Sequence, residues 1–123
     1  MEFGGLSNKI IGCVIEVHKN LGPGLLESTY ERCLAHELNA NGLKYETQKE
    51  IPIDYKGIKL DAGYRIDIIV EDNVILELKS AEKILPIHEA QILTYMKLAK
   101  VHTGLLINFN VLKVKDGLKR FVL

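Results

Sequence analysis

Residues 64–79 read YRIDIIVEDNVILELK, and this stretch carries the clearest fold signal in the chain. Two runs rich in Ile, Val and Leu, which favour β-strands, flank a polar tripeptide at 71–73. Such a tripeptide suits a hairpin turn, with Asn73 able to adopt a left-handed conformation. The stretch therefore predicts two antiparallel strands in which Val70 pairs with Val74.

Two acidic residues stand inside these apolar strands. Counting back from the turn places Asp67 opposite Glu77, where two like charges destabilise an antiparallel pair. Acidic side chains are rarely buried in a core sheet without a partner, and a divalent cation between them would reverse the repulsion. Strand alternation puts Lys79 on the same face as Glu77. Two acids and a lysine on one patch are the constellation of a metal-dependent phosphodiesterase.

Magnesium prefers oxygen ligands and keeps several waters, so two carboxylates and a substrate phosphate suffice. Asp67 and Glu77 supply that minimum, and the backbone carbonyl of Leu78 could add a third oxygen. Lys79 would then orient the attacking water and stabilise negative charge on the phosphate. The alternative is that Lys79 forms an ordinary ion pair with one of the two acids at the end of a sheet.

The bulk properties indicate an ordinary globular chain. Its 123 residues suit one domain over 1–123, and 47% hydrophobic with 26% charged residues excludes a disordered composition. No apolar run approaches the ~20 residues of a membrane span, and the N-terminus lacks a signal-peptide pattern. We expect a soluble, cytoplasmic protein without membrane contacts, in which Cys13 and Cys33 are reduced thiols.

Sixteen basic residues balance sixteen acidic ones, so the formal net charge is zero. A tight, non-specific DNA binder is usually more basic than this. A local basic patch remains open at Lys113, Lys115, Lys119 and Arg120, although these four residues equally suit the solvated face of a hairpin.

The remaining elements follow from helical spacing and from glycine and proline. Ser7 is the expected cap of the first helix, which Gly22 ends, and Pro86 starts the last one. The expected elements are helix 7–21, helix 25–41, strand 43–55, strand 58–60, the two strands of 64–79, helix 86–100, a parallel strand 103–109, and a terminal hairpin of 111–114 with 118–123. This order predicts an α/β sandwich whose mixed sheet is flanked by helices.

Other polar residues could join the site, each with a structural alternative. Glu27 falls three residues after Gly24, so it could cap a helix instead of binding metal. Gln91 and Tyr95 share a helix face, where they could orient substrate or simply seat the helix on the sheet. A phosphate contact is open to Arg65, which could equally pair with a surface acid.

A family resemblance covers nearly the whole chain. Residues 24–30 read GLLESTY, and the chain resembles the GxxExxY proteins, a branch of the PD-(D/E)xK nuclease superfamily. The other matching segments are Gly22-Pro23-Gly24, Tyr55-Lys56-Gly57, Gly63-Tyr64-Arg65-Ile66-Asp67, Glu77-Leu78-Lys79, Pro86-Ile87-His88-Glu89-Ala90-Gln91 and Leu105-Leu106-Ile107-Asn108-Phe109. One departure is that Ile66, not proline, precedes Asp67.

The resemblance implies a restriction-endonuclease-like αβββαβ core. It identifies Asp67, Glu77 and Lys79 as the catalytic triplet and places Glu27 near the metal. It also aligns Gln91 and Tyr95 with a QxxxY element, which makes Gln91 a further catalytic candidate. Contacts with substrate are expected from Tyr95, Arg65 and Tyr30.

The leading hypothesis is a nuclease dependent on Mg²⁺ or Mn²⁺ that hydrolyses phosphodiester bonds of DNA. A catalytically silent adaptor or nucleic-acid-binding module that keeps the fold is the alternative, and the neutral charge favours it. A purely structural role is the third option. A homodimer would give so small a nuclease domain more contacts with its substrate.

Overall fold

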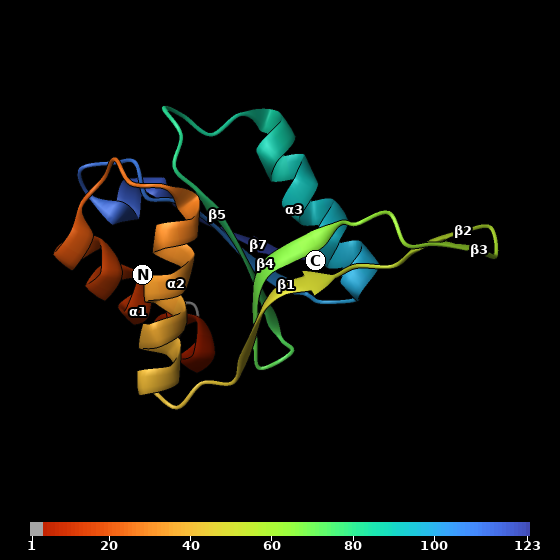
Figure 1. Cartoon of the computed structure of the whole chain (residues 1–123), viewed down its shortest axis with the longest axis horizontal. Helices are drawn as coiled ribbons and strands as arrows, with labels where there is room; N and C mark the ends of the chain where they lie inside the picture. Colours follow the sequence, from red (N-terminus) through yellow and green to blue (C-terminus); the bar gives the residue numbers. More distant parts are fainter. Residues whose placement is uncertain (1–3) are drawn as a thin grey trace.

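The computed structural model describes residues 4–123. The elements in chain order are α1 (Gly5–Leu21), α2 (Glu27–Ala40), β1 (Tyr45–Glu50), β2 (Ile53–Tyr55), β3 (Ile58–Leu60), β4 (Arg65–Val70), β5 (Val74–Lys79), α3 (Pro86–Ala99), β6 (Thr103–Asn108), the 3₁₀ helix η1 (Val114–Gly117) and β7 (Leu118–Val122). Helices α1 and α2 cover one face of the sheet and α3 covers the other (Figure 1). The predicted α/β sandwich with a mixed sheet is therefore confirmed.

Five strands form the central sheet in the order β1-β4-β5-β6-β7. The hairpin of β4 and β5 has the predicted register, with Val70 opposite Val74. Strand β6 runs parallel to β5 after the crossover through α3, as its apolar sequence indicates. Omitting the short hairpin of β2 and β3, the chain from α2 to β6 follows the αβββαβ order.

The core consists of apolar clusters on the two faces of this sheet. Leu76, Leu78 and Ile107 pack with residues of α1 and α2, whereas Ile75 and Leu106 pack with residues of α3. Period-two alternation in β5 and β6 produces this division, because successive side chains point to opposite faces. None of the helices in residues 4–123 has the length and apolar character needed to cross a membrane.

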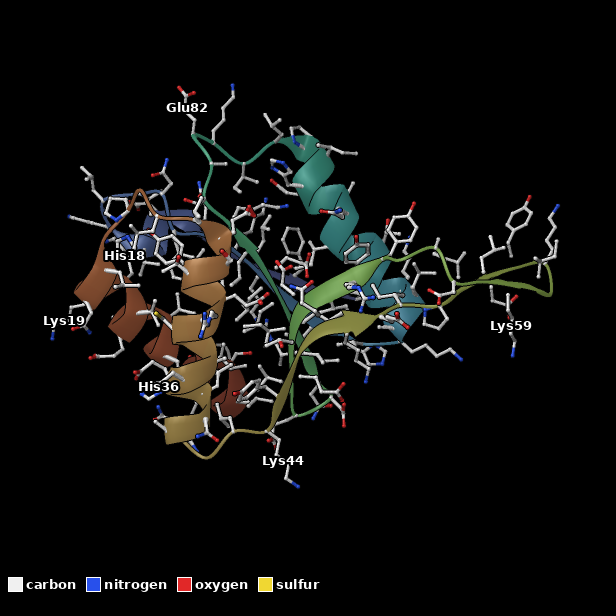
Figure 2. The ribbon with its side chains drawn as sticks, viewed as in Figure 1. His18, Lys19, His36, Lys44, Lys59 and Glu82 are labelled. Atoms are coloured by element: carbon white, nitrogen blue, oxygen red, sulfur yellow. The ribbon has the colours of Figure 1, made fainter. Side chains whose placement is uncertain are left out.

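The strand expected over 43–55 is divided in two. Its first part pairs with β4 as β1, and Pro52 follows, which has no N–H to donate to a ladder. Strands β2 and β3 then form a separate arm that projects from the body (Figure 1), with Lys59 far from α1 and α2 (Figure 2). Lys56 and Gly57 both have positive φ at its turn, which matches the twist of a tight hairpin.

The terminal hairpin prediction is wrong in its first strand. Residues 111–113 form no strand, and β7 pairs with β6 instead, so that Thr103 lies opposite Val122. The backbone at Gly117 lies close to that of Asn108, and a Cβ at position 117 would lie 2.0 Å from the Asn108 carbonyl oxygen. The buried edge of β6 is thus the better partner for the last strand, since it gains both backbone pairing and apolar contacts.

One predicted helix cap and one predicted turn conformation are wrong. Helix α1 begins before Ser7, with Gly4 at the N-cap, so Ser7 lies buried inside the helix and does not cap it. In the turn between β4 and β5, Glu71 and Asp72 adopt the left-handed conformation predicted for Asn73. Gly22 does end α1, and its φ of 71° explains the choice of glycine.

Candidate active site

The candidate site lies where strands β4 and β5 separate. Backbone pairing between them reaches Ile68 and Leu76, and the next residues toward this end of the sheet are Asp67 and Glu77. Beyond the pair of Ile68 and Leu76, side-chain carboxylates accept the hydrogen bonds of the backbone N–H groups. The N–H of Asp67 donates to Oε2 of Glu77 at 2.9 Å. The N–H of Leu78 donates to Oδ2 of Asp67 at 2.8 Å. The two predicted acids are therefore neighbours, each held by a backbone amide.

A change in strand alternation makes this separation possible. Ile66 and Ile69 both pack in the cluster beneath α3, whereas Ile68 packs in the cluster beneath α1 and α2. Strict alternation would place the side chains of Ile66 and Ile68 on the same face of the sheet. They lie on opposite faces, so the alternation of β4 is interrupted at Asp67. Sequence periodicity alone could not show this interruption, because all three side chains are isoleucine.

Both carboxyl groups are buried enough to disfavour their charged forms. Burial, followed by the negative charge of Asp67, raises the pKa of Glu77 to about 8. Burial likewise raises the pKa of Asp67, although the hydrogen bond from Leu78 and the positive charge of Lys79 lower it. Glu77 is only 4% exposed. The positive charge of Lys79 does not offset the effect of burial, and a cation at this point would stabilise both ionised groups.

Lys79 ends β5 next to the two acids. Its charge lowers the pKa of both Asp67 and Glu77, so the ammonium group lies within electrostatic reach of each. The ion pairs formed between residues 4–123 do not include Lys79, which distinguishes it from the alternative of an ordinary ion pair. Its three donors are thus directed to no fixed carboxylate.

Helix α3 brings Gln91 and Tyr95 to the same site. Nε2 of Gln91 donates to the Tyr95 hydroxyl at 3.2 Å, which confirms that the two side chains share a face. Burial raises the pKa of Tyr95, and the negative charges of Glu77 and then Asp67 raise it further. The tyrosine ring therefore lies near both carboxylates.

Glu27 is the first residue of α2, with Leu26 at the N-cap. The proposed capping arrangement with Gly24 at the N-cap is therefore wrong, because the helix begins two residues later than that arrangement needs. The charge of Glu27 raises the pKa of Glu77, although less than burial and Asp67 do. Within residues 4–123, however, no three His, Cys, Asp or Glu side chains gather as a metal site.

The structure also places a pair of residues at the site that the motifs did not indicate. Nε2 of Gln48 donates to Oε1 of Glu31 at 2.6 Å, and the Gln48 side chain also lowers the pKa of Asp67 by hydrogen bonding. Gln48 has a φ of 52°, and the pairing of β1 with β4 skips Gln48 and Asp67. The position of Glu31, four residues after Glu27 on one helix, was a readable signal. No sequence pattern indicated Gln48, because its place at the site depends on this irregular backbone.

Two predicted substrate contacts are engaged elsewhere. The guanidinium of Arg65 donates to Oε1 of Glu50 at 3.0 Å and to the carbonyl of Gln48 at 3.3 Å. Tyr30 is fully buried, and its ring stacks on Phe109 with centroids 4.3 Å apart. Neither side chain is directed to the carboxylates in this structure.

The loop before α2 explains why position 30 is a tyrosine. Its hydroxyl donates to the carbonyl of Gly22 at 2.6 Å and accepts from the N–H of Leu25 at 3.2 Å. The hydroxyl of Ser80 donates to the carbonyl of Leu25 at 2.6 Å, which joins this loop to the end of β5. Tyr30 and Ser80 therefore position the start of α2, and Glu27 with it, beside the site.

His88 has a structural role at the start of α3. Its Nδ1 accepts a hydrogen bond from the N–H of Leu85 at 3.0 Å, as a helix cap does. The imidazole is therefore engaged with the backbone at the start of the helix.

Searches of the curated proteins and of the solved structures returned no significant match. The family model described as the PD-(D/E)XK nuclease superfamily matches residues 5–121. The matched region contains all the described helices and strands of the sheet except the last residue of β7. The chain therefore belongs to the PD-(D/E)XK nuclease superfamily.

Proposed function

We propose that the protein is a Mg²⁺- or Mn²⁺-dependent nuclease that hydrolyses phosphodiester bonds of DNA. The observation that carries the proposal is the reciprocal contact of Asp67 and Glu77 beside Lys79, at the point where two core strands part. Nucleases of this superfamily generally use divalent metal ions. We also propose that the chain falls in the GxxExxY branch and that residues 1–123 form one catalytic domain, since residues 24–30 read GLLESTY.

The donor set suits a hard divalent cation. Asp67 and Glu77 each accept a backbone N–H with one carboxylate oxygen, and a carboxylate has enough lone pairs to bind a cation as well. The carbonyl oxygen of Leu78 is the third candidate donor. Two carboxylates with one main-chain oxygen leave positions for waters and a substrate phosphate, as Mg²⁺ prefers. The assignment of Glu27 as a further ligand remains a prediction, because it is not gathered with the other two acids.

When bound there, the cation would polarise the phosphate and ease deprotonation of the attacking water. The chain's own residues do the rest. Lys79 can hydrogen-bond the attacking water and stabilise the negative charge that develops on the phosphate. Gln91 can orient a phosphate oxygen or a water through its amide, and the Tyr95 hydroxyl holds that amide in place.

Cleavage assays test this proposal most directly. Single- and double-stranded DNA, with RNA of the same sequence, would be incubated with Mg²⁺, Mn²⁺ or EDTA. We expect metal-dependent cutting by the wild-type protein and by Lys83→Ala, which removes an exposed lysine four residues away. Lys79→Ala should not cut, although its circular dichroism and melting temperature should match the wild type. Cutting that persists in Lys79→Ala would remove the proposed mechanism.

The formal net charge of zero favours a second candidate function. A catalytically silent binding module would need the fold but not the metal, and it would bind its partner without turnover. Binding to labelled DNA in EDTA across a salt titration separates the two functions. Full loss of binding without metal would argue against the silent module, whereas unchanged binding with no cutting in any metal would support it.

A further inference from the structure

An apolar hollow of about 320 Å³ opens beside the candidate active site. Its lining includes Tyr64 before β4, Ile53 in β2, and Ile87, Gln91, Tyr95 and Leu98 on α3. Most of this lining is apolar, and Gln91, Thr94 and Tyr95 are among its residues that carry polar groups. An apolar lining with a few polar groups is typical of a small-ligand site.

The hollow shares two of its lining residues with the surroundings of the carboxylate site. Gln91 and Tyr95 line the hollow and also form the hydrogen-bonded pair described above. Tyr64 stands three residues before Asp67 on the same segment. A ligand that occupied the hollow would therefore have its neighbouring groups at Asp67 and Glu77.

Exposed aromatic and aliphatic surface makes up much of this hollow. Tyr64 is 48% exposed and Ile87 is 67% exposed. The ring of Tyr64 meets that of Tyr95 edge to face, with centroids 6.5 Å apart and an interplanar angle of 62°. An aromatic ring that is about half exposed offers surface on which another flat group can pack.

We propose that this hollow binds one unpaired nucleobase of the strand whose phosphate lies at Asp67 and Glu77. This inference rests on the proposed nuclease function and specifies its substrate as a single strand, a frayed end or an extruded nucleotide. A base within a duplex is covered by its neighbours on both faces, so it cannot enter the hollow without leaving the stack. The base would stack on Tyr64 and direct its polar edge to Gln91.

The charge of the chain supports a binding mode that depends on bases. Affinity for a duplex comes largely from neutralised phosphates, and the formal net charge of this chain is zero. Base–aromatic stacking does not need a basic surface, and it tolerates any base because every base has a π-face. The hollow thus offers the affinity that the overall charge does not provide.

Binding measurements with matched strands test the inference. The probes are a fluorescently labelled oligothymidylate, a strand of the same length with abasic sugars, and the corresponding duplex. Affinity would be measured for the full chain in EDTA, and again in Mg²⁺ in a Lys79→Ala background. The variants are Tyr64→Ala, Tyr64→Phe, which keeps the ring, and Tyr55→Ala, which removes a similarly exposed tyrosine from the arm.

We expect Tyr64→Ala to weaken oligothymidylate binding about 5- to 150-fold, the range of base–aromatic stacking. Tyr64→Phe and Tyr55→Ala should bind as the wild type does, and the abasic strand should bind weakly to every form. Equal affinity of Tyr64→Ala and wild type, equal binding of abasic and base-bearing strands, or no binding of any strand would overturn the inference.

The readout separates this inference from the nuclease proposal. Binding requires no turnover, so a wild-type protein that binds through Tyr64 but never cuts would contradict the nuclease proposal and leave the base site supported. A wild-type protein that cuts, while Tyr64→Ala binds and cuts equally well, would contradict the base site alone.

Discussion

The backbone N–H of Asp67 donates to the carboxylate of Glu77 at 2.9 Å, at the place where an ordinary ladder would continue between their strands. The Asp67 carboxylate accepts in turn from the N–H of Leu78. The orientation of each acid is therefore set by the main chain of the opposite strand. A site built in this way keeps its arrangement when no ligand is bound, which is the preorganisation that electrostatic catalysis requires.

Metal should stabilise the folded protein without being needed for folding. Adding Mg²⁺ should raise the melting temperature, by the equivalent of about 2.7 kcal/mol at 100 times the dissociation constant. The apolar clusters on both sheet faces hold the fold, so EDTA should leave the far-ultraviolet circular dichroism unchanged. Thermal unfolding with and without Mg²⁺ measures both effects.

Asp67→Asn should abolish the Mg²⁺-induced rise, because the amide oxygen can still accept from Leu78 but carries no charge. Asp54→Asn is the matched control, since that aspartate lies on the arm. An equal rise in all three proteins would place the metal elsewhere.

The metal-free protein should lose stability as the pH rises. The folded-state pKa of Glu77 is about 8, against an ordinary value of 4.5, so between these values the folded state binds more protons than the unfolded state. Through Glu77, the free energy of unfolding therefore falls with pH in this window, by at most about 1.4 kcal/mol per unit. Urea unfolding in EDTA at several pH values measures this slope.

Glu77→Gln should flatten that slope, because its side chain cannot lose a proton. The matched control is Glu82→Gln, which changes an exposed acid in the loop after β5 (Figure 2) and should keep the wild-type slope. A wild-type stability that stays level or rises over this range would contradict the buried, protonated state of Glu77.

Gln48 should support activity without touching the substrate. Its amide connects Glu31 with Asp67, and its φ of 52° suits glycine, so Gln48→Gly removes the side chain without backbone strain. Residues that orient a metal ligand typically contribute 10–100-fold, and we expect a loss of about that size in the cleavage rate or the Mg²⁺ affinity. A Mg²⁺ titration of the cleavage rate measures both.

Thr47→Gly is the control for Gln48→Gly, since it puts glycine at the neighbouring exposed position of β1. The interpretation fails if both variants lose activity equally, because a general weakening of the strand would then explain the result.

Tyr30→Phe should lower stability and leave substrate affinity unchanged. The change removes the hydroxyl that joins Gly22 to Leu25, so a half-buried carbonyl and a backbone N–H both lose a partner. We expect a loss of about 1–3 kcal/mol in the free energy of unfolding. Chemical denaturation gives this value, with Tyr45→Phe on β1 as the comparison. A stable Tyr30→Phe protein that binds DNA poorly would restore the earlier prediction of a substrate contact.

Much of the fold was readable from local patterns. The turn at 71–73 between two apolar runs determined the register of Val70 and Val74, because a short loop leaves few ways to pair its flanking strands. Helix α3 was readable from Pro86 and the helical spacing after it. The last hairpin was not, since β7 pairs with β6 and not with residues 111–114, and Gly117 approaches Asn108 at the end of β6.

By itself the sequence determined which acids face each other across the central hairpin, since register follows from the turn and the side-chain period of two. Only the tertiary structure decided how they meet. The tertiary structure interrupts the side-chain alternation of β4 at Asp67 and places Gln48 and Glu31 beside that residue. It also buries Tyr30 and pairs Arg65 with Glu50. These features depend on contacts between segments distant along the chain, and local propensity does not specify such contacts.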